Sequence, residues 1–230
     1  MPHNPLGVIQ DAQVRSVLTR LHREARTELP GLLFHYLRYL PRLLRGASLP
    51  WREMESYYAD KYLALEPAQA AFCYLLARLI SAKTIVEFGT SYGISTIWLA
   101  QAVRESGDPT AKVIGTEIVR AKVARAQSHL DEAGVSGWVD ILEGDARESL
   151  RSVRIPIDML LLDGFPPSAL PVLRLIEPHL RVGAVVIADN TGTFRRDLEP
   201  LVTYLRDPNH GYRSLNVPFK SGTEVAIRCS

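Results

Sequence analysis

The sequence predicts an α/β fold: a doubly wound, mostly parallel seven-stranded sheet with a C-terminal antiparallel hairpin and an N-terminal helical extension. Two observations carry this prediction. From residue 84 to residue 206, apolar runs of strand length alternate five times with segments of helical periodicity. Two further strand-like runs, 213–217 and 224–228, then follow too closely for a crossover helix, so they must pair antiparallel.

Length and composition fit one α/β domain with an addition. The chain has 230 residues, and 47% of them are hydrophobic, which is ample for a core. We expect residues 1–66 to form a helical extension that acts as a lid or a dimer contact. Residues 67–230 are expected to form the ligand-binding domain.

Charge and cysteine content narrow the class of protein. A formal net charge of +2, with no block of basic residues in the core, does not favour a nucleic-acid partner. Cys73 and Cys229 lie in apolar stretches and suit a reducing compartment, so a cytoplasmic location is expected. No leader-like segment and no run of about eighteen uncharged residues is present, so integral membrane association is not expected.

The extension is predicted to contain two helices between Val8 and Leu44, broken near Leu29-Pro30-Gly31 because proline and glycine end helices. The second helix, residues 31–45, is basic and amphipathic and is expected to kink at Pro41. We expect its leucine stripe to pack on a partner subunit, giving a homodimer, or to roof the active site; a membrane-surface role is the less favoured alternative. The stripe comprises Leu33, Leu37, Leu40 and Leu44, and the basic face comprises His35, Arg38, Arg42 and Arg45.

An aromatic group follows the extension's helices. It comprises Trp51, Tyr57, Tyr58 and Tyr62. Two interpretations are equally open: these side chains line a pocket for a substrate, or they only pack between the extension and the core.

The segment 84–99, TIVEFGTSYGISTIWL, indicates a buried strand, a glycine turn and the start of a helix. Gly89 and Gly93 permit a tight turn and a close approach by a ligand. The free N–H groups at the start of the helix favour a polar, nucleotide-like cofactor. The alternative is an ordinary strand-to-helix turn that happens to contain two glycines.

Two more strands end in acidic residues and favour S-adenosylmethionine as the cofactor. Glu117 ends the strand 112–117, where a carboxylate can accept hydrogen bonds from both ribose hydroxyls of an adenosine. Asp145 follows the strand 138–142 in the segment Glu-Gly-Asp-Ala. Neither the dinucleotide fingerprint nor a phosphate-binding loop is present, so NAD and ATP are disfavoured.

The next two strands end in Asp163 and in Asp189-Asn190. Because the carboxyl ends of parallel strands share one edge of a sheet, these side chains are expected to be neighbours. Two carboxylates and an amide oxygen are hard ligands that suit Mg²⁺ best and also Mn²⁺ or Ca²⁺. The alternative is that Asp189 and Asn190 only stabilise a loop. No zinc motif is present.

The motifs together resemble the metal-dependent, catechol O-methyltransferase-like family of S-adenosylmethionine-dependent methyltransferases, over Pro67 to the C-terminus. The motifs that carry the resemblance are EFGTSYGIS (87–95), GTEI (115–118), EGDA (143–146), LLDGF (161–165) and ADN (188–190). The resemblance implies a Rossmann-like fold and methyl transfer to an oxygen of a small hydroxylated, possibly phenolic, acceptor.

The resemblance also implies roles for individual residues. Gly89, Ser91 and Ser95 would hold the methionine part of the cofactor, and Glu117 would hold its ribose. Asp145 and Ala146 would contact the adenine, and Glu87 and Asp163 are expected among the cofactor-binding residues. The metal ligands implied are Asp163, Asp189 and Asn190.

One departure from the family concerns Pro166. Similar family members carry a lysine there, shortly after the first metal aspartate, where it helps to deprotonate the acceptor hydroxyl. With proline in its place, Asp163 would act through the metal, and we identify no protein base; His35 and His210 are the rival candidates. The alternatives are a non-catalytic S-adenosylmethionine binder, a methyltransferase with a different acceptor atom and, least favoured, a nicotinamide-linked oxidoreductase.

Overall fold

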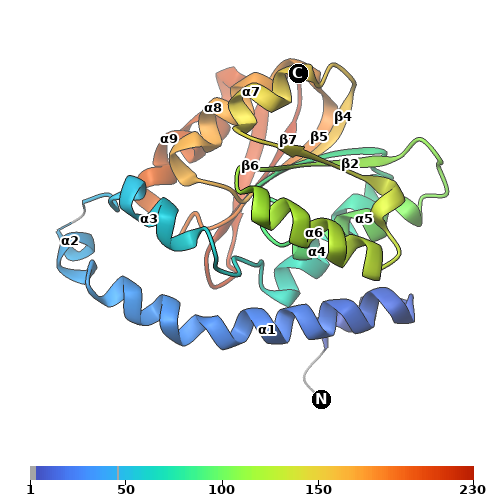
Figure 1. Cartoon of the computed structure of the whole chain (residues 1–230). Coiled ribbons are helices and arrows are strands. Elements are labelled where there is room, and N and C mark those ends of the chain that lie inside the picture. Colours follow the sequence, from blue (N-terminus) through green and yellow to red (C-terminus); the bar gives the residue numbers. More distant parts are fainter. Residues whose placement is uncertain (1–3, 46) are drawn as a thin grey trace.

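The computed structural model describes residues 4–45 and 47–230 and shows a seven-stranded sheet between two layers of helices (Figure 1). The strand order is β3-β2-β1-β4-β5-β7-β6. Strands β1 to β5 pair in parallel, while β7 pairs antiparallel with both β5 and β6. The predicted fold class is therefore confirmed. The strands are β1 (Thr84–Phe88), β2 (Lys112–Glu117), β3 (Val139–Glu143), β4 (Ile157–Leu162), β5 (Leu180–Ala188), β6 (Tyr212–Val217) and β7 (Thr223–Arg228).

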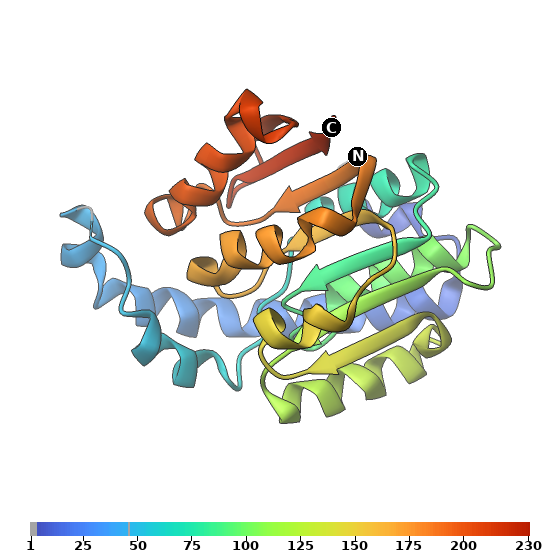
Figure 2. The same cartoon turned by 90° about the horizontal axis from the view of Figure 1, so that it is seen from above.

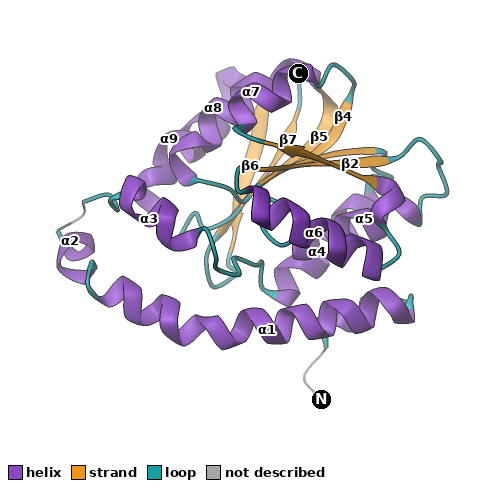
Figure 3. Cartoon of the chain, viewed as in Figure 1, coloured by secondary structure: helices purple, strands orange, loops and turns teal. Residues whose placement is uncertain are grey.

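Helices cover both faces of the sheet, as the alternation of strands and helices requires. In Figure 3 the orange strands lie between two groups of purple helices, α4 to α6 on one side and α7 to α9 on the other. Both faces of β1 and β4 are buried. The helices are α1 (Ala12–Leu37), α2 (Leu40–Leu44), α3 (Trp51–Tyr58), α4 (Pro67–Leu79), α5 (Ile94–Arg104), α6 (Arg120–Glu132), α7 (Ala146–Ser149), α8 (Ala169–Ile176) and α9 (Arg195–Arg206).

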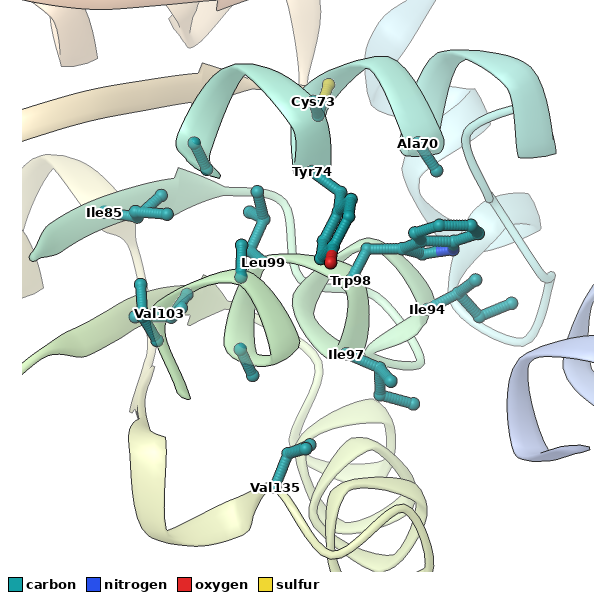
Figure 4. Close-up of a cluster of buried hydrophobic side chains, with 14 of the residues drawn as sticks. Ala70, Cys73, Tyr74, Ile85, Ile94, Ile97, Trp98, Leu99, Val103 and Val135 are labelled. Atoms are coloured by element: carbon teal, nitrogen blue, oxygen red, sulfur yellow. The ribbon is translucent and has the colours of Figure 1, made fainter. Parts of the chain in front are cut away.

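The core under α4 and α5 is centred on Trp98, which is fully buried. Figure 4 shows its indole beside Tyr74 of α4, above Ile94 and Ile97 of its own helix. The indole Nε1 donates a hydrogen bond to Nε2 of His22 on α1 at 3.1 Å, so α1 is joined to this core by a buried polar contact. Burial lowers the pKa of His22 to about 4.

The N-terminal helix differs from the sequence prediction. Helix α1 runs without a break through Pro30, and the chain instead leaves the helix at Arg38 and Tyr39. Pro30 and Arg26, whose carbonyl loses its helical partner, are both exposed, so water can satisfy that carbonyl. Two of the buried residues of α1 are Ala25 before Pro30 and Leu32 after it, so the helix lies against the protein on both sides of the proline.

The predicted kink at Pro41 is also absent, because Pro41 lies in the first turn of α2, where a missing N–H is tolerated. The leucine stripe does not form a buried face: Leu33, Leu37, Leu40 and Leu44 are all exposed. The first half of α1 packs on the core instead, through Val14, Val17, Leu18, Leu21 and Ala25.

In two views at right angles, the second half of α1 reaches beyond the helical layer toward α3 (Figures 1 and 2). The division of the chain at residue 66 remains a prediction, and residues 1–3 and 46 of the predicted extension lie outside the described residues. Within the described ranges, no helix combines the length and the apolar character needed to cross a bilayer.

Candidate active site

The loops at the carboxyl ends of β1, β2, β4 and β5 meet at one cavity of about 1640 Å³. Gly89, Glu117, Asp163 and Asp189, which end or follow these strands, all line it. The prediction that the acidic residues share one edge of the sheet is therefore confirmed. The cavity is closed on the opposite side by α1, α3 and the segment 59–66.

Gly89 is required by the packing of two loops. Its φ is +103°, and a Cβ atom there would lie 2.6 Å from Cα of Gly164. Gly164 in turn lies against the ring of Phe88, where a Cβ would come within 2.7 Å. The loop after β1 and the loop after β4 thus touch backbone to backbone, and this contact fixes Asp163 next to the glycine turn.

Glu117 is held in place by two backbone N–H groups. Ser91 donates to Oε2 at 2.9 Å and Val119 donates to Oε1 at 2.8 Å. Ser91 adopts a left-handed conformation with φ of +49°, which is unusual for a residue other than glycine and is typical of functional loops. Glu117 therefore presents an oriented carboxylate to the cavity, in agreement with a ribose-binding role.

Lys122 is a cavity residue that the sequence analysis missed. It belongs to α6 and is 4% exposed, with Nζ 3.4 Å from Oγ of Ser91 and 5.4 Å from the ring centroid of Tyr92. Burial lowers the pKa of its ammonium group. The one signal in the sequence for this role is its position five residues after Glu117. The first turn of the helix that follows a strand lies at the same edge of the sheet as the end of that strand.

Glu87 and Ser95 are buried but do not line the cavity, so their cofactor-binding roles remain predictions. The hydroxyls of Thr90 and Thr96 donate to Oε2 of Glu87 at 3.0 and 2.5 Å. Its Oε1 has no hydrogen-bond partner among the described residues. Burial raises the pKa of this carboxyl group.

Asp145 and Ala146 line the same cavity, at the start of α7. Asp145 caps this short helix by accepting from the N–H of Arg147 at 2.9 Å, and it also pairs with the Arg147 guanidinium at 2.6 Å. This rigid turn lies next to the end of β2, because Gly144 donates its N–H to the carbonyl of Glu117 at 2.9 Å. The predicted adenine contacts and the ribose carboxylate are thus adjacent.

Asp163, Asp189 and Asn190 form one cluster, as predicted. The Asn190 amide lies 3.3 Å from Oδ1 of Asp163 and 3.0 Å from Oδ2 of Asp189. Two residues that the sequence analysis missed, Gln69 and Ser221, donate to Oδ1 of Asp189 at 2.6 and 2.8 Å. They are far from Asp189 in sequence, so no local pattern could reveal them.

Asp163 and Asp189 disfavour each other's ionisation. Burial and the neighbouring Asp189 raise the pKa of Asp163 well above its usual range, and burial raises that of Asp189. Among the basic side chains that the structure describes, which leave out Arg52, none lies within 4.0 Å of either carboxylate. A bound cation would relieve this repulsion, since buried charges require a partner.

Few side chains at this place could bind a metal ion. In the described part of the chain, no three His, Cys, Asp or Glu side chains gather as metal ligands. A metal here would need water or substrate oxygens beside the two carboxylates, which is compatible with hard cations. Asn190 would also have to present its amide oxygen, whereas its Nδ2 donates to both carboxylates in this structure. Asn190 has φ of +61°, a conformation that asparagine tolerates and that aims its side chain at both aspartates.

Aromatic rings wall the cavity beside the carboxylates. Trp51 packs edge-on against Phe165 and Phe194, with centroid distances of 5.4 and 5.0 Å, and Phe194 also lies 6.3 Å from Tyr36. The hydroxyl of Tyr36 is hydrogen-bonded to that of Tyr58. Nε1 of Trp51 is buried without a partner among the described residues.

The members of the aromatic group differ in whether they line the cavity. Trp51, Tyr58 and Tyr62 line the cavity. Tyr57 instead stacks on His35, with ring centroids 3.4 Å apart, and neither of these two is a lining residue.

No replacement for the missing lysine is apparent at the position of Pro166, which is buried and lines the cavity. His210 contacts Tyr204 at a different surface, and His35 lies outside the cavity lining. His22 does line the cavity, but its Nε2 is occupied by Trp98. The described histidines therefore offer no free imidazole beside Asp163 and Asp189.

Comparison with known proteins agrees with this arrangement. Residues 86–191 match a family described as "Methyltransferase domain". The chain is 33% identical over 132 residues to catechol O-methyltransferase of Niastella koreensis, covering 56% of this chain and 58% of the relative. It is 30% identical over 129 residues to catechol O-methyltransferase of Mycobacterium tuberculosis, covering 56% and 57%. The match thus spans less than two thirds of either relative.

Solved structures show the same architecture. The O-methyltransferase TomG of Streptomyces achromogenes, in complex with S-adenosylmethionine, is 28% identical, with a TM-score of 0.64 over 73% of this chain and 82% of that chain. An O-methyltransferase of Bacillus cereus in complex with S-adenosylhomocysteine, 19% identical with a TM-score of 0.65 over 77% and 88%, supports the fold alone.

The fold is the Rossmann-like fold of O-methyltransferases such as TomG, with the acidic residues gathered at the edge of the sheet where such folds bind ligands. Within that fold, residues 86–191 match the methyltransferase domain family, and the chain is similar to two catechol O-methyltransferases. The resemblance that the motifs predict is thereby confirmed.

Proposed function

We propose that this protein transfers a methyl group from S-adenosylmethionine to an oxygen of a hydroxylated, phenolic acceptor. The observation that carries the proposal is that one cavity joins Glu117 and Asp145, suited to an adenosine, to the carboxylate pair Asp163 and Asp189. The TomG complex with S-adenosylmethionine and the two catechol O-methyltransferases support the choice of cofactor and acceptor.

The reaction is an in-line displacement at the methyl carbon. The acceptor oxygen forms a bond to that carbon while the bond to sulfur breaks, and the electron pair of the broken bond remains on sulfur. The hydroxyl proton must leave before or during this step. Alignment of the two ligands is therefore a main task of the site, and Glu117 contributes by fixing the ribose.

We also propose a divalent metal at Asp163, Asp189 and Asn190, with Mg²⁺ the first choice and Mn²⁺ or Ca²⁺ compatible. The support is the buried pair of carboxylates at the cavity, which disfavour each other's ionisation and offer hard oxygen donors. When bound, such a cation lowers the pKa of a neighbouring hydroxyl, which Pro166 cannot do. Gln69 and Ser221 would hold Asp189 in position, and the rings of Trp51, Phe165 and Phe194 would exclude water.

The test is an acceptor screen with S-adenosylmethionine and Mg²⁺, in which mass spectrometry detects the gain of one methyl group. We expect a chelator to abolish turnover and Mg²⁺ to restore it. We expect Asp189→Ala to remove turnover while S-adenosylhomocysteine still binds in calorimetry. The control is Asp140→Ala, which changes an exposed carboxylate on β3.

The outcomes separate the alternatives. Full turnover in chelator would reject the metal but not methyl transfer. Binding of S-adenosylhomocysteine without methylation of any acceptor would favour a non-catalytic binder, and methylation of a nitrogen or sulfur would identify a different acceptor atom. Calorimetric binding of NAD instead would favour the oxidoreductase.

Oligomeric state and location remain predictions. The exposed Leu37, Leu40 and Leu44 support a homodimer, since a large apolar surface is unusual on a monomer. Cys73 and Cys229 are both free, which supports the expectation of a cytoplasmic location. Light scattering would test the dimer.

A further inference from the structure

One face of α1 lines the cavity over more than four helical turns. The lining residues on this helix recur at the spacing of a single helical face, and the stretch from Leu29 onward contains no charged lining residue. These residues are Thr19, His22, Arg23, Ala25, Arg26, Leu29, Leu32, Leu33 and Tyr36. From Leu29 to Tyr36 the helix rises about 10 Å. The cavity therefore has an apolar arm along α1, which we define by Leu29, Leu32, Leu33 and Tyr36.

The apolar arm is continuous with the carboxylate pair. Phe165 and Phe194, which follow Asp163 and Asn190 closely in the chain, contact Trp51, and Phe194 lies beside Tyr36 at the end of the arm. An unbroken path of aromatic and aliphatic side chains thus leads from the proposed methyl acceptor position to Leu29.

The opposite wall of the arm is tied to α1. Leu63 lines the cavity from the segment between α3 and α4. In that segment, the N–H of Tyr62 donates to Glu28 at 3.0 Å and its hydroxyl donates to Glu24 at 2.9 Å. These bonds hold the segment alongside the helix, so the arm is a built part of the cavity.

The volume of the cavity and the exposure of two leucines indicate room for an apolar group along the arm. A site for one drug-sized ligand has about 300–1000 Å³, and this cavity has about 1640 Å³. It is large enough for a cofactor and a second ligand of comparable size. Leu29 and Leu33 are 56% and 67% exposed although they line the cavity. Burying them against an apolar group would be favourable.

We propose that the acceptor is amphipathic: a hydroxylated ring lies at Asp163 and Asp189, and an aliphatic tail attached to it extends along the apolar arm. This inference rests on the proposed function and names its substrate class. The tail is preferred over a second protein chain because the arm opens directly into the reaction cavity and its length of two helical turns matches one extended chain.

The test is a series of 4-alkylcatechols with methyl, butyl and octyl tails, assayed for methylation with S-adenosylmethionine and Mg²⁺. We expect kcat/KM to rise about two- to fourfold per added methylene until the arm is filled, because a buried methylene contributes this much to binding. Calorimetry of the same compounds in the presence of S-adenosylhomocysteine should show the same order of affinities.

Leu33→Gln is the variant that tests the apolar arm. The side chain of Leu33 is exposed to solvent, so the change should not unfold the protein. We expect it to lower the ratio of kcat/KM for the octyl compound to that for the methyl compound about tenfold. Leu44→Gln, an equally polar change at a leucine 78% exposed and outside the cavity lining, should leave the ratio unchanged.

Equal kcat/KM and equal affinity across the series would overturn the inference while leaving methyl transfer intact. An unchanged ratio in Leu33→Gln would also overturn it. A change in mass per particle in Leu33→Gln, measured by light scattering, would assign this face to a second copy of the chain instead. Tail-dependent binding without methylation would reject the proposed function but leave the arm as a ligand site.

Discussion

The prediction that tests the cofactor site most directly is Glu117→Ala. In the structure this carboxylate is 9% exposed, faces the cavity and is oriented by the N–H groups of Ser91 and Val119. If it accepts hydrogen bonds from the ribose, the variant buries two hydroxyls without their acceptor. It also releases the two N–H groups that hold the turn, including the strained Ser91.

The expected magnitude follows from these contacts. An unpaired buried polar group costs about 1 to 3 kcal/mol. This corresponds to a loss of affinity of about five- to 150-fold. We expect the upper part of this range, because the same change removes both the ribose acceptor and the support of the turn.

The measurement is the calorimetric Kd for S-adenosylhomocysteine, with thermal unfolding as a check that the variant is folded. Glu143→Ala is the matched control, since Glu143 is the register partner of Glu117 on β3 but is exposed and outside the cavity lining. A folded Glu117→Ala protein that binds within twofold of the parent would remove Glu117 from the cofactor site.

Two further predictions concern stability. Gly89→Ala should destabilise the protein by on the order of 2 kcal/mol or more and lower Tm by about 4–8 °C, because its Cβ would collide with the backbone at Gly164 in addition to the strain of a positive φ. Gly107→Ala is the control: its φ is +74° but nothing lies within 4 Å of the added Cβ, so it should show the smaller effect of strain alone. Equal losses of stability in the two variants would contradict the collision. His22, whose pKa is lowered to about 4 in the folded state, binds its proton more weakly there than when unfolded, so its contribution is complete above pH 6.5 and is lost as the pH falls toward 4. Between pH 7 and pH 5 the free energy of unfolding should fall by about 2 kcal/mol more in the parent than in His22→Gln, as measured by urea unfolding, and parallel curves would show that His22 is not buried in its neutral form.

The sequence by itself determined the sheet and the rim of acids. Each parallel strand is a short apolar run, and the residue that follows it must lie at the same edge of the sheet. The proximity of Glu117, Asp163 and Asp189 was therefore predictable from their positions alone. The glycine at position 89 was predictable as a turn residue, although its contact with Gly164 was not.

Only the tertiary structure decided what surrounds that rim. The local signals at Pro30 and Gly31 predict a helix end, but α1 continues past them, with Ala25 and Leu32 buried on either side, and brings Tyr36 to the cavity. Gln69 contacts Asp189 across 120 residues of chain. Helical periodicity shows which residues share a face, but the burial of that face depends on what lies opposite. For this reason the sequence identified a leucine stripe on the extension, of which only Leu33 lines the cavity, and the structure adds Leu29 and Leu32 to that wall.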